Sequence, residues 1–239
     1  MALRQLGALQ GDEALLRQAI KGFETALTCR TQQDDPKGWA STQNALGMTW
    51  QALGERTQER DDLEQALSAY TAALRIRTEE DSPLEWAATQ NNLGTAYRYL
   101  SELTEEEDFA AAADAFGATL QARSLEHTPQ DWATTQNNLG GALATLGEMR
   151  QDMGLLDEAV AAFRGALNVF TRTAAPFDWA RTRINVAIAL RSKYLFEERD
   201  EDRLMALQAL SGVEAELLER DAKSLLRLYY QVAGQIAQL

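Results

Sequence analysis

Near the middle of the chain stands the stretch WATTQNNLG, residues 132–140, and it recurs three more times in altered form. The other copies are WASTQNALG at 39–47, WAATQNNLG at 86–94 and the more diverged WARTRINVA at 179–187. Each copy starts with a tryptophan, and the four tryptophans are 47, 46 and 47 residues apart. Self-similarity at a fixed period of this size indicates a stacked repeat architecture, in which each unit buries its apolar face against its neighbours.

A proline stands three residues before each of these tryptophans, and the chain has no others: Pro36, Pro83, Pro129 and Pro176. Asp35, Ser82 and Thr128 precede the first three, so a capping side chain is followed by proline at the first helical position, where its missing N–H costs nothing. Ser82 and Glu85 also have the spacing of a capping box. Each proline therefore predicts the start of a helix of roughly 19 residues, called helix A of its repeat.

One face of helix A is predicted to be buried. If each tryptophan is position 0, then positions 0, 3, 4, 7, 8, 11, 14 and 15 fall within one arc of the helical wheel, which holds most of the large apolar residues. The tryptophans share this arc with the leucines, so we expect core residues rather than a ligand cage: Trp39, Trp86, Trp132 and Trp179.

A second helix, helix B, is predicted after each helix A from an apolar series with i, i+3, i+4, i+7 spacing. The series begins at Leu63 in the first repeat and at Leu156 in the third. In the second repeat it begins at Phe109 after a turn one residue shorter, which explains the 46-residue interval. The sequence therefore predicts an all-α superhelix, or solenoid, of antiparallel helix pairs, with about ten helices and no strands.

Both ends of the chain keep the same register. Leu6 and Gly7 stand one period before Leu53 and Gly54, so the chain is expected to begin inside a helix A. Such a start suggests excision from a longer protein and an exposed apolar surface at the N-terminal half repeat, which would favour self-association. The predicted boundaries within the single domain 1–239 are 1–34 for the half repeat, 35–81, 82–127 and 128–174 for three repeats, 175–221 for a degenerate fourth, and 222–239 for a capping helix.

Composition argues against several classes of function. The chain has 239 residues, a net charge of −13, one cysteine and one histidine. Its acidity argues against binding to a phosphate backbone, so no nucleic-acid partner is expected. The sequence has neither an apolar run long enough to span a bilayer nor a signal peptide, which predicts a cytoplasmic protein without a membrane partner. A lone Cys29 rules out an internal disulfide.

The sequence predicts no enzyme, no metal site and no cofactor. It has no glycine-rich phosphate loop and no metal-ligand spacing, and nothing in its pattern would make His127 a general base. Acidic residues cluster after each copy of the motif, around 55–62, 102–108 and 197–202. We expect a solvated edge that places negative charge at the start of the next helix, and the alternative is a docking edge for a basic partner.

The sequence resembles the tetratricopeptide repeat family, and the resemblance covers essentially the whole chain. The family pattern of small and aromatic positions is matched in the first repeat by Leu46, Gly47, Trp50, Ala66, Tyr70, Ala73 and Pro83. The usual period of the family is about 34 residues, so the extra residues here imply longer helices and turns. The string TQNNLG is similar to the kinesin-light-chain class of these repeats and to arrays attached to bacterial signalling and protease modules.

The resemblance implies that the face of helix A opposite the buried arc lines a concave peptide-binding groove. Position 5 of this face holds Asn44, Asn91 and Asn137, with Ile184 breaking the series, and position 6 holds Asn92, Asn138 and Asn185. Asparagine is a poor helix former, so its recurrence calls for a reason. An amide has both a donor and an acceptor and can bind the backbone of an extended peptide. We predict groove binding at position 5 and a structural role at position 6. The alternatives for these asparagines are that they tie adjacent repeats together or that duplication copied them without a role.

Other groove positions vary between repeats and are predicted to supply selectivity: Gln51, Thr95, Arg98, Tyr99, Arg181 and Arg191. Arginines on an acidic protein could accept an acidic or C-terminal peptide, or they could pair with nearby acids of the chain itself. At the spacing of packed helices, about 10 Å, one asparagine would meet about every third residue of an extended peptide.

Two functional hypotheses follow. The first is a protein- or peptide-binding scaffold that uses the groove. The second is a structural or oligomerising segment of a larger multidomain protein, with no peptide ligand of its own.

Overall fold

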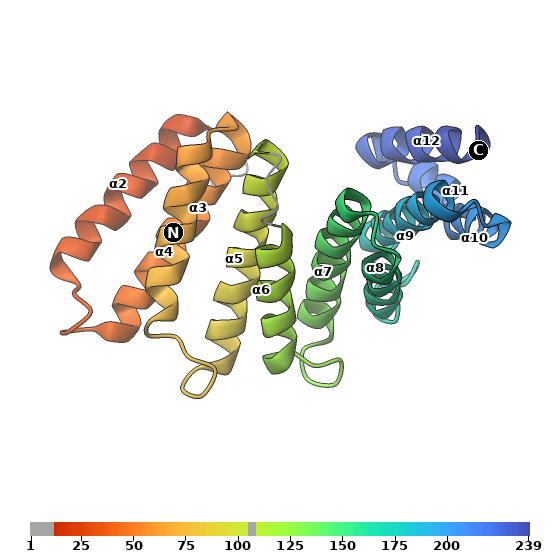
Figure 1. Cartoon of the computed structure of the whole chain (residues 1–239). Helices are drawn as coiled ribbons and strands as arrows, with labels where there is room; N and C mark the ends of the chain where they lie inside the picture. Colours follow the sequence, from red (N-terminus) through yellow and green to blue (C-terminus); the bar gives the residue numbers. More distant parts are fainter. Residues whose placement is uncertain (1–11, 105–108) are drawn as a thin grey trace. The chain divides into compact units, whose positions relative to one another are not determined.

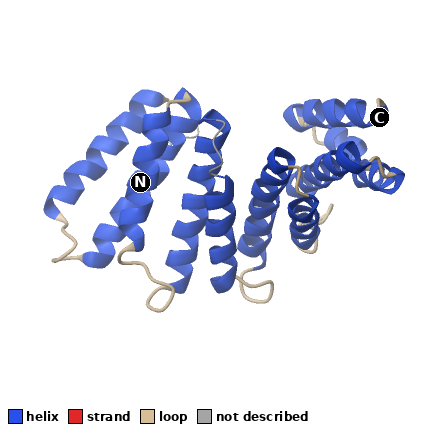
Figure 2. Cartoon of the chain, in the orientation of Figure 1, coloured by secondary structure: helices blue, strands red, loops and turns tan. Residues whose placement is uncertain are grey.

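The computed structural model describes residues 12–104 and 109–239, and in these residues it is helical with no strand (Figures 1 and 2). The first helices are α2 (Glu13–Cys29), α3 (Pro36–Thr57), α4 (Arg60–Leu74), α5 (Pro83–Thr104) and α6 (Phe109–Ala122). They are followed by α7 (Pro129–Arg150), α8 (Met153–Ala166), α9 (Pro176–Glu197), α10 (Asp200–Leu210), α11 (Val213–Glu219) and α12 (Lys223–Ala237). The all-α prediction is confirmed.

The chain forms two compact units, with α2 to α6 before residue 123 and α7 to α12 from Arg123 onward. Within unit 1, helix pairs α3/α4 and α5/α6 pack together, α2 packs on α3, and α4 packs on α5. Within unit 2, α7/α8 and α9/α10 form the corresponding pairs, α8 packs on α9, and α12 lies against α9, α10 and α11. Consecutive helices therefore pack as pairs of helix A and helix B, as the periodicity predicts.

The prolines mark the helix starts as predicted. Helices α3, α5, α7 and α9 each begin at a proline and each run for 22 residues. Asp35 caps α3 by accepting a hydrogen bond from the backbone N–H of Gly38 at 2.9 Å. The predicted cap at Thr128 is wrong, because its side chain makes no capping hydrogen bond. Thr128 instead donates to the Ser124 carbonyl at 3.3 Å, within the loop before the helix.

Three helices A end at a residue with left-handed backbone conformation, and it stands at the same position in each of the three repeats. These residues are Gln58, Gln151 and Glu198, with φ of 56°, 52° and 52°. The predicted shorter turn of the second repeat falls on residues 105–108 and lies outside the described residues. The same holds for the start inside a helix A at Leu6 and Gly7. The fourth helix B differs from the prediction, because it breaks at Gly212 (φ 77°) into α10 and α11.

Glycine at position 8 of helix A allows helix B to approach closely. A Cβ atom at Gly140 would lie 2.8 Å from Phe163 Cδ1, and one at Gly47 would lie 2.7 Å from Tyr70 Cε1. These distances are far inside van der Waals contact, so each aromatic ring packs directly on the glycine backbone of its partner helix. Tyr70 and Phe163 are both fully buried as a result.

The fourth repeat changes both partners of this contact together. Position 8 is Ala187, and the aromatic of helix B is replaced by Leu210. Both residues are buried, at 0% and 4% exposure. The larger residue on one helix is thus offset by a smaller one on the other, which conserves the packed volume.

The tryptophan prediction needs a correction. Trp39, Trp86, Trp132 and Trp179 are only half-buried, whereas the alanine that follows each of them is fully buried. Helix A is covered on several sides, since α3 contacts α2, α4 and α5. Burial therefore extends beyond the predicted arc to positions 1 and 10, where small residues allow backbones to approach. Trp132 and Trp179 still pack on the buried cluster of Ala133, Ala166 and Phe170, as core-edge residues do.

We predict that Gly140→Ala destabilises the protein by about 1 to 3 kcal/mol, because the added methyl group overpacks the contact with Phe163. Adding Phe163→Leu, which reproduces the pairing of the fourth repeat, should recover part of that loss. The matched control is Gly141→Ala, one residue further on, where a Cβ would meet nothing within 4 Å. That change should stabilise the helix by about 0.5 to 1 kcal/mol. Urea denaturation measures all three, and equal effects of the two glycine substitutions would contradict the packing described.

Candidate functional site

The outward face of the helices A carries the residues predicted to bind a peptide. In unit 1 this helix-A face is formed by positions 5, 9, 12 and 16 of α3 and α5, which contact each other directly. On α3 these positions are Asn44, Met48, Gln51 and Glu55, and on α5 they are Asn91, Thr95, Arg98 and Glu102. Most of these side chains are half-buried rather than fully exposed. Neighbouring helices A therefore shield the face from the side while leaving its outer part accessible.

The asparagines connect successive repeats through their side-chain carbonyl groups. Asn92 Nδ2 donates to Asn44 Oδ1 at 3.3 Å, and Asn185 Nδ2 donates to Asn137 Oδ1 at the same distance. Thr182 Oγ1 adds a third bond of 3.0 Å to the Asn137 oxygen. The structural role predicted for position 6 is thereby confirmed for Asn92 and Asn185. Position 5 accepts these bonds, so its carbonyl oxygen is already used within the protein.

The side-chain amide nitrogens of Asn44 and Asn137 have no strong acceptor among the described residues. Asn44 Nδ2 contacts Met48 Sδ at 3.7 Å, and a thioether sulfur is only a weak acceptor. Asn137 Nδ2 has no partner among the described residues. On α5, the backbone carbonyl of Asn91 accepts a hydrogen bond from Thr95 Oγ1 at 2.9 Å. The fourth repeat has no equivalent amide, because Ile184 at position 5 is fully buried.

Gln51 is held by two partners. Its Nε2 donates to Glu55 Oε1 at 2.7 Å, and the Tyr70 hydroxyl donates to its Oε1 at 2.9 Å. Tyr70 is the ring that packs on Gly47, so the contact between helices A and B also orients this polar side chain. Gln51 is thus a positioned residue of the helix-A face rather than a freely rotating one.

The arginines of the predicted groove are mostly paired with acids. Arg98 forms an ion pair with Glu102 one turn along α5, and its guanidinium lies 4.2 Å from the centre of the Tyr99 ring. Arg181 pairs with Asp178 on α9. Of the two alternatives left open by the sequence, pairing with nearby acids therefore holds for Arg98 and Arg181. Arg191 is half-buried, and its Nε has no hydrogen-bond partner among the described residues.

Glu55 is the carboxyl of this face with a perturbed pKa. Desolvation of the group raises its pKa above the ordinary value of 4.5, although the residue as a whole is exposed. The hydrogen bond from Gln51 and the charge of Arg98 lower the pKa, but their combined effect is smaller. Glu55 lines a small cavity of about 180 Å³ together with Leu63, Tyr99 and Glu102. The structure therefore brings Gln51, Arg98 and Tyr99 into one polar cluster.

A recurrent arginine that the sequence reasoning missed also links the repeats. Arg30, Arg77 and Arg123 each stand nine residues before a repeat tryptophan, and each donates from Nη1 to the buried threonine at position 3 of the next helix A. The three distances are 3.2, 2.9 and 2.8 Å. Burial lowers the pKa of Arg77 and Arg123 below the ordinary value. The regular spacing was the available signal, and the fourth repeat replaces this arginine with the buried Phe170.

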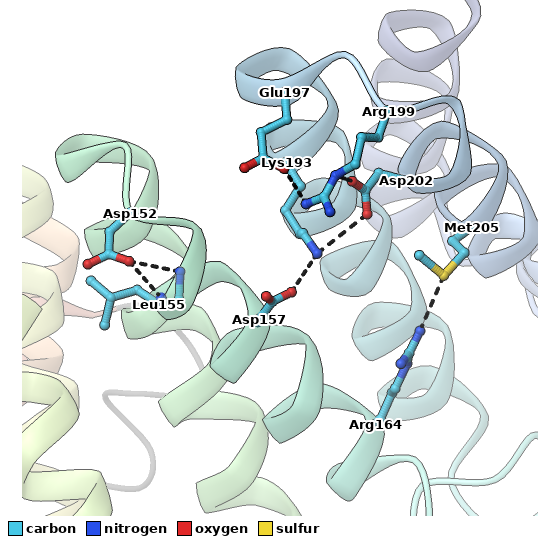
Figure 3. Close-up of polar contacts among 10 residues, drawn as sticks. Asp152, Leu155, Asp157, Arg164, Lys193, Glu197, Arg199, Asp202 and Met205 are labelled. Carbon is cyan, nitrogen blue, oxygen red and sulfur yellow. Dashed lines mark hydrogen bonds and ion pairs between the residues drawn. The ribbon is translucent and has the colours of Figure 1, made fainter.

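Some of the described acids of the repeated clusters lie in the first turns of helices B, where negative charge is favourable, whereas Glu55, Glu102 and Glu197 lie near the ends of helices A. Asp61 and Asp62 occupy the first turn of α4, and residues 200–202 occupy that of α10. In the fourth repeat the buried Asp202 also pairs with Lys193, which occupies a core leucine position of helix A and contacts Asp157 on α8 as well (Figure 3). The placement at helix starts agrees with one part of the solvated-edge interpretation, but Asp62 and Asp202 are buried rather than solvated.

Comparison with known proteins agrees with this architecture. The tetratricopeptide repeat profile matches residues 39–80 and 132–172. Together with the paired helices, these two matches support a repeat protein of the tetratricopeptide type. Among solved structures, MamA is similar with a TM-score of 0.58 and 18% identity, over 93% of this chain and 98% of that one. BtubC (BKLC) from P. vanneervenii is similar with a TM-score of 0.54 and 17% identity, over 96% and 85%.

These identities are low, so the two structures support the fold alone. No curated protein sequence matches the chain significantly. No helix in the described part of the chain is both long enough and apolar enough to cross a bilayer. The described residues also contain no group of three or more histidine, cysteine or acidic side chains placed to hold a metal ion.

The raised pKa of Glu55 predicts a pH-dependent effect on stability. An acid that binds its proton more tightly in the folded state destabilises that state when it ionises, so the loss appears as the pH rises above 4.5. Glu55→Gln should therefore be more stable than the parent chain at about pH 7, and the difference should vanish below about pH 4. Chemical denaturation at the two pH values measures this difference in the free energy of unfolding.

The control is Glu148→Gln, an exposed residue at the same position 16 of helix A in the third repeat. It should change stability little at either pH, as surface substitutions do. A parent chain more stable than Glu55→Gln at neutral pH would show that the Glu55 carboxylate is not destabilised by its surroundings.

Proposed function

We propose that the chain is a peptide-binding scaffold and that its helix-A face binds the backbone of an extended partner segment. Tetratricopeptide repeats support protein interaction in general. The observation that carries the proposal of peptide binding concerns the asparagine ladder, which is the set of asparagines at positions 5 and 6 of the helices A. The two ends of the position-5 side-chain amides Asn44 and Asn137 have different roles. The carbonyl ends of Asn44 and Asn137 are used between repeats, whereas their N–H groups lack a strong acceptor.

This arrangement favours donation to peptide carbonyl groups. The bonds from Asn92 and Asn185 fix the orientation of the position-5 amides, so little side-chain entropy remains to be lost on binding. A pre-oriented donor on a half-buried surface is partly shielded from water, which strengthens its hydrogen bonds. Backbone recognition of this kind tolerates many side chains, which suits a scaffold.

Selectivity is expected from the neighbouring cluster in unit 1. Arg98 is neutralised by Glu102, and Glu55 has no arginine of its own in an ion pair among the described residues. The cluster is therefore not strongly positive, and the structure gives little support to a preference for acidic peptides at this place. Tyr99, with Arg98 stacked on its ring, offers a flat surface for an apolar or aromatic side chain.

The test uses peptides selected from a random phage-displayed library on the intact chain, with affinities measured by calorimetry. Asn44→Asp keeps an oxygen that accepts from Asn92 but removes the Nδ2 donor. If that donor binds a peptide carbonyl, affinity should fall about fivefold to tenfold, as expected for one lost main-chain hydrogen bond. The fold should be retained, as judged by circular dichroism and thermal melting. Asn137→Asp is the corresponding change in unit 2.

The matched control is Ser41→Asp, which adds the same charge to the exposed position 2 of α3 without removing an amide. It should leave affinity within about twofold of the parent. Equal losses for Ser41→Asp and Asn44→Asp would indicate charge repulsion rather than a lost hydrogen bond. If no selected peptide responds to Asn44→Asp or Asn137→Asp, the helix-A face is not the binding surface and the second hypothesis, a structural segment, gains support.

A further inference from the structure

A separate cavity lies on the opposite side of α9, toward the helices B of unit 2. It measures about 520 Å³ and is walled by α8 and α10, with α9 between them. The residues of α9 that line it are Arg183, Val186 and Leu190, at positions 4, 7 and 11 of the helix. These belong to the buried arc and not to positions 5, 9, 12 and 16, so the cavity is distinct from the helix-A face.

The sequence of the fourth repeat explains why the cavity exists. Position 11 is a large aromatic residue in the first two repeats, Trp50 and Tyr97, but a leucine in the third and fourth, Leu143 and Leu190. Position 7, a leucine in the other repeats, is Val186. Smaller side chains at both positions leave volume between the two helices B that nothing else in the fold fills.

Arg183 shapes one wall of the cavity. Its Nε donates to the Ala209 carbonyl at 2.6 Å, and its Nη2 donates to the Gln208 carbonyl at 2.6 Å. It thereby satisfies the carbonyl groups at the end of α10, next to the break at Gly212. Burial lowers the pKa of Arg183 below its ordinary value. This arginine is therefore a fixed structural group whose positive charge remains at the cavity.

Arg164 of α8 is the second arginine that lines the cavity, and its only hydrogen-bond acceptor among the described residues is a weak one. Its Nη2 points toward Met205 of α10, with a contact of 3.7 Å to the sulfur (Figure 3). A thioether is a weak acceptor, whereas a guanidinium has five donors suited to a carboxylate. Among the described residues, Arg164 has no ion pair with an acid, and the lining of the cavity includes no carboxylate. In a chain of net charge −13, a cavity with two arginines and no acid is electrostatically complementary to an anionic ligand.

Exposed apolar residues border the cavity on α10. Leu204 and Leu207 are 66% and 43% exposed and flank the lining residues Met205 and Gln208. The residues corresponding to Leu204 are Glu64, Ala110 and Asp157 in the first three repeats, so a large apolar side chain here is specific to the fourth helix B. Apolar surface that continues beyond the cavity favours a protein segment over a small molecule, which would fill the cavity alone.

We infer that this cavity is a second docking pocket, which takes an apolar side chain of a partner protein and pairs an adjacent carboxylate with Arg164. Leu167, Val186 and Leu190 contact the apolar side chain, and the carboxylate replaces the weak Met205 contact of the guanidinium. The pocket works independently of the helix-A face, because it shares none of the asparagines of the ladder.

The experiment pans a random phage-displayed peptide library on the whole chain and on Gln208→Trp, whose indole fills the cavity from an exposed position. Peptides recovered only on the parent chain should carry an aliphatic or aromatic residue beside Asp or Glu. Their affinity for Arg164→Glu should fall about tenfold or more, because a charge pair is replaced by repulsion. The control Arg227→Glu makes the same charge change at an exposed position of α12, outside both the cavity lining and the helix-A face, and should leave affinity within about twofold.

The inference is overturned if the same peptides are recovered on Gln208→Trp as on the parent, or if Arg164→Glu and Arg227→Glu weaken binding equally. Circular dichroism checks that each variant is folded. If every recovered peptide responds to Asn44→Asp and none responds to Gln208→Trp, the pocket is refuted while the helix-A face is supported. If every recovered peptide shows the reverse response, the pocket is supported and the proposed function is refuted.

Discussion

The close contact between a glycine of helix A and an aromatic ring of helix B is the constraint on which the rest of the structure depends. Gly47, Gly94 and Gly140 each face a ring of the paired helix at a distance that leaves no room for a Cβ atom. Because the ring is packed on bare backbone, each helix pair has a fixed crossing and separation. Where the glycine becomes Ala187, the ring becomes Leu210, so the constraint is kept by exchanging volume between the two helices.

Fixed helix pairs place the polar side chains of the helices A at regular intervals, and hydrogen bonds between repeats follow from that placement. Within each unit, the asparagine bonds join two helices A, and the arginine–threonine bonds join the segment before a helix A to that helix. The same amides that tie repeats together retain N–H groups on the outward face, and this combination underlies the proposed peptide binding. The fourth repeat departs from the pattern at several places, with Phe170, Ile184, Lys193 and Leu210, and the cavity beside Arg164 is found there.

Much of the fold could be predicted from the sequence, because proline and capping residues recur at one period and place the helix starts at Pro36 and its equivalents. The burial of positions 1 and 10 could not be predicted, because it depends on contacts with neighbouring helices rather than on the apolar pattern of one helix. For the site, periodicity identified the asparagines. It could not show that the side-chain oxygen of Asn44 accepts a bond from the next repeat while its nitrogen lacks a strong acceptor, which follows only from the distances. The pairing of Arg98 with Glu102 was one of two open alternatives, and side-chain geometry decided between them.

The most direct measurement of the central claim is an NMR titration that follows the side-chain amide resonances of the ladder as a selected peptide is added. If the position-5 donors bind the peptide backbone, the Nδ2 resonances of Asn44 and Asn137 should shift with saturation, because their N–H groups gain strong acceptors. Those of Asn92 and Asn185 should shift less, since their bonds to the preceding repeat are already formed. Shifts confined to Asn92 and Asn185, or no shift in any of the four during saturable binding, would contradict the account.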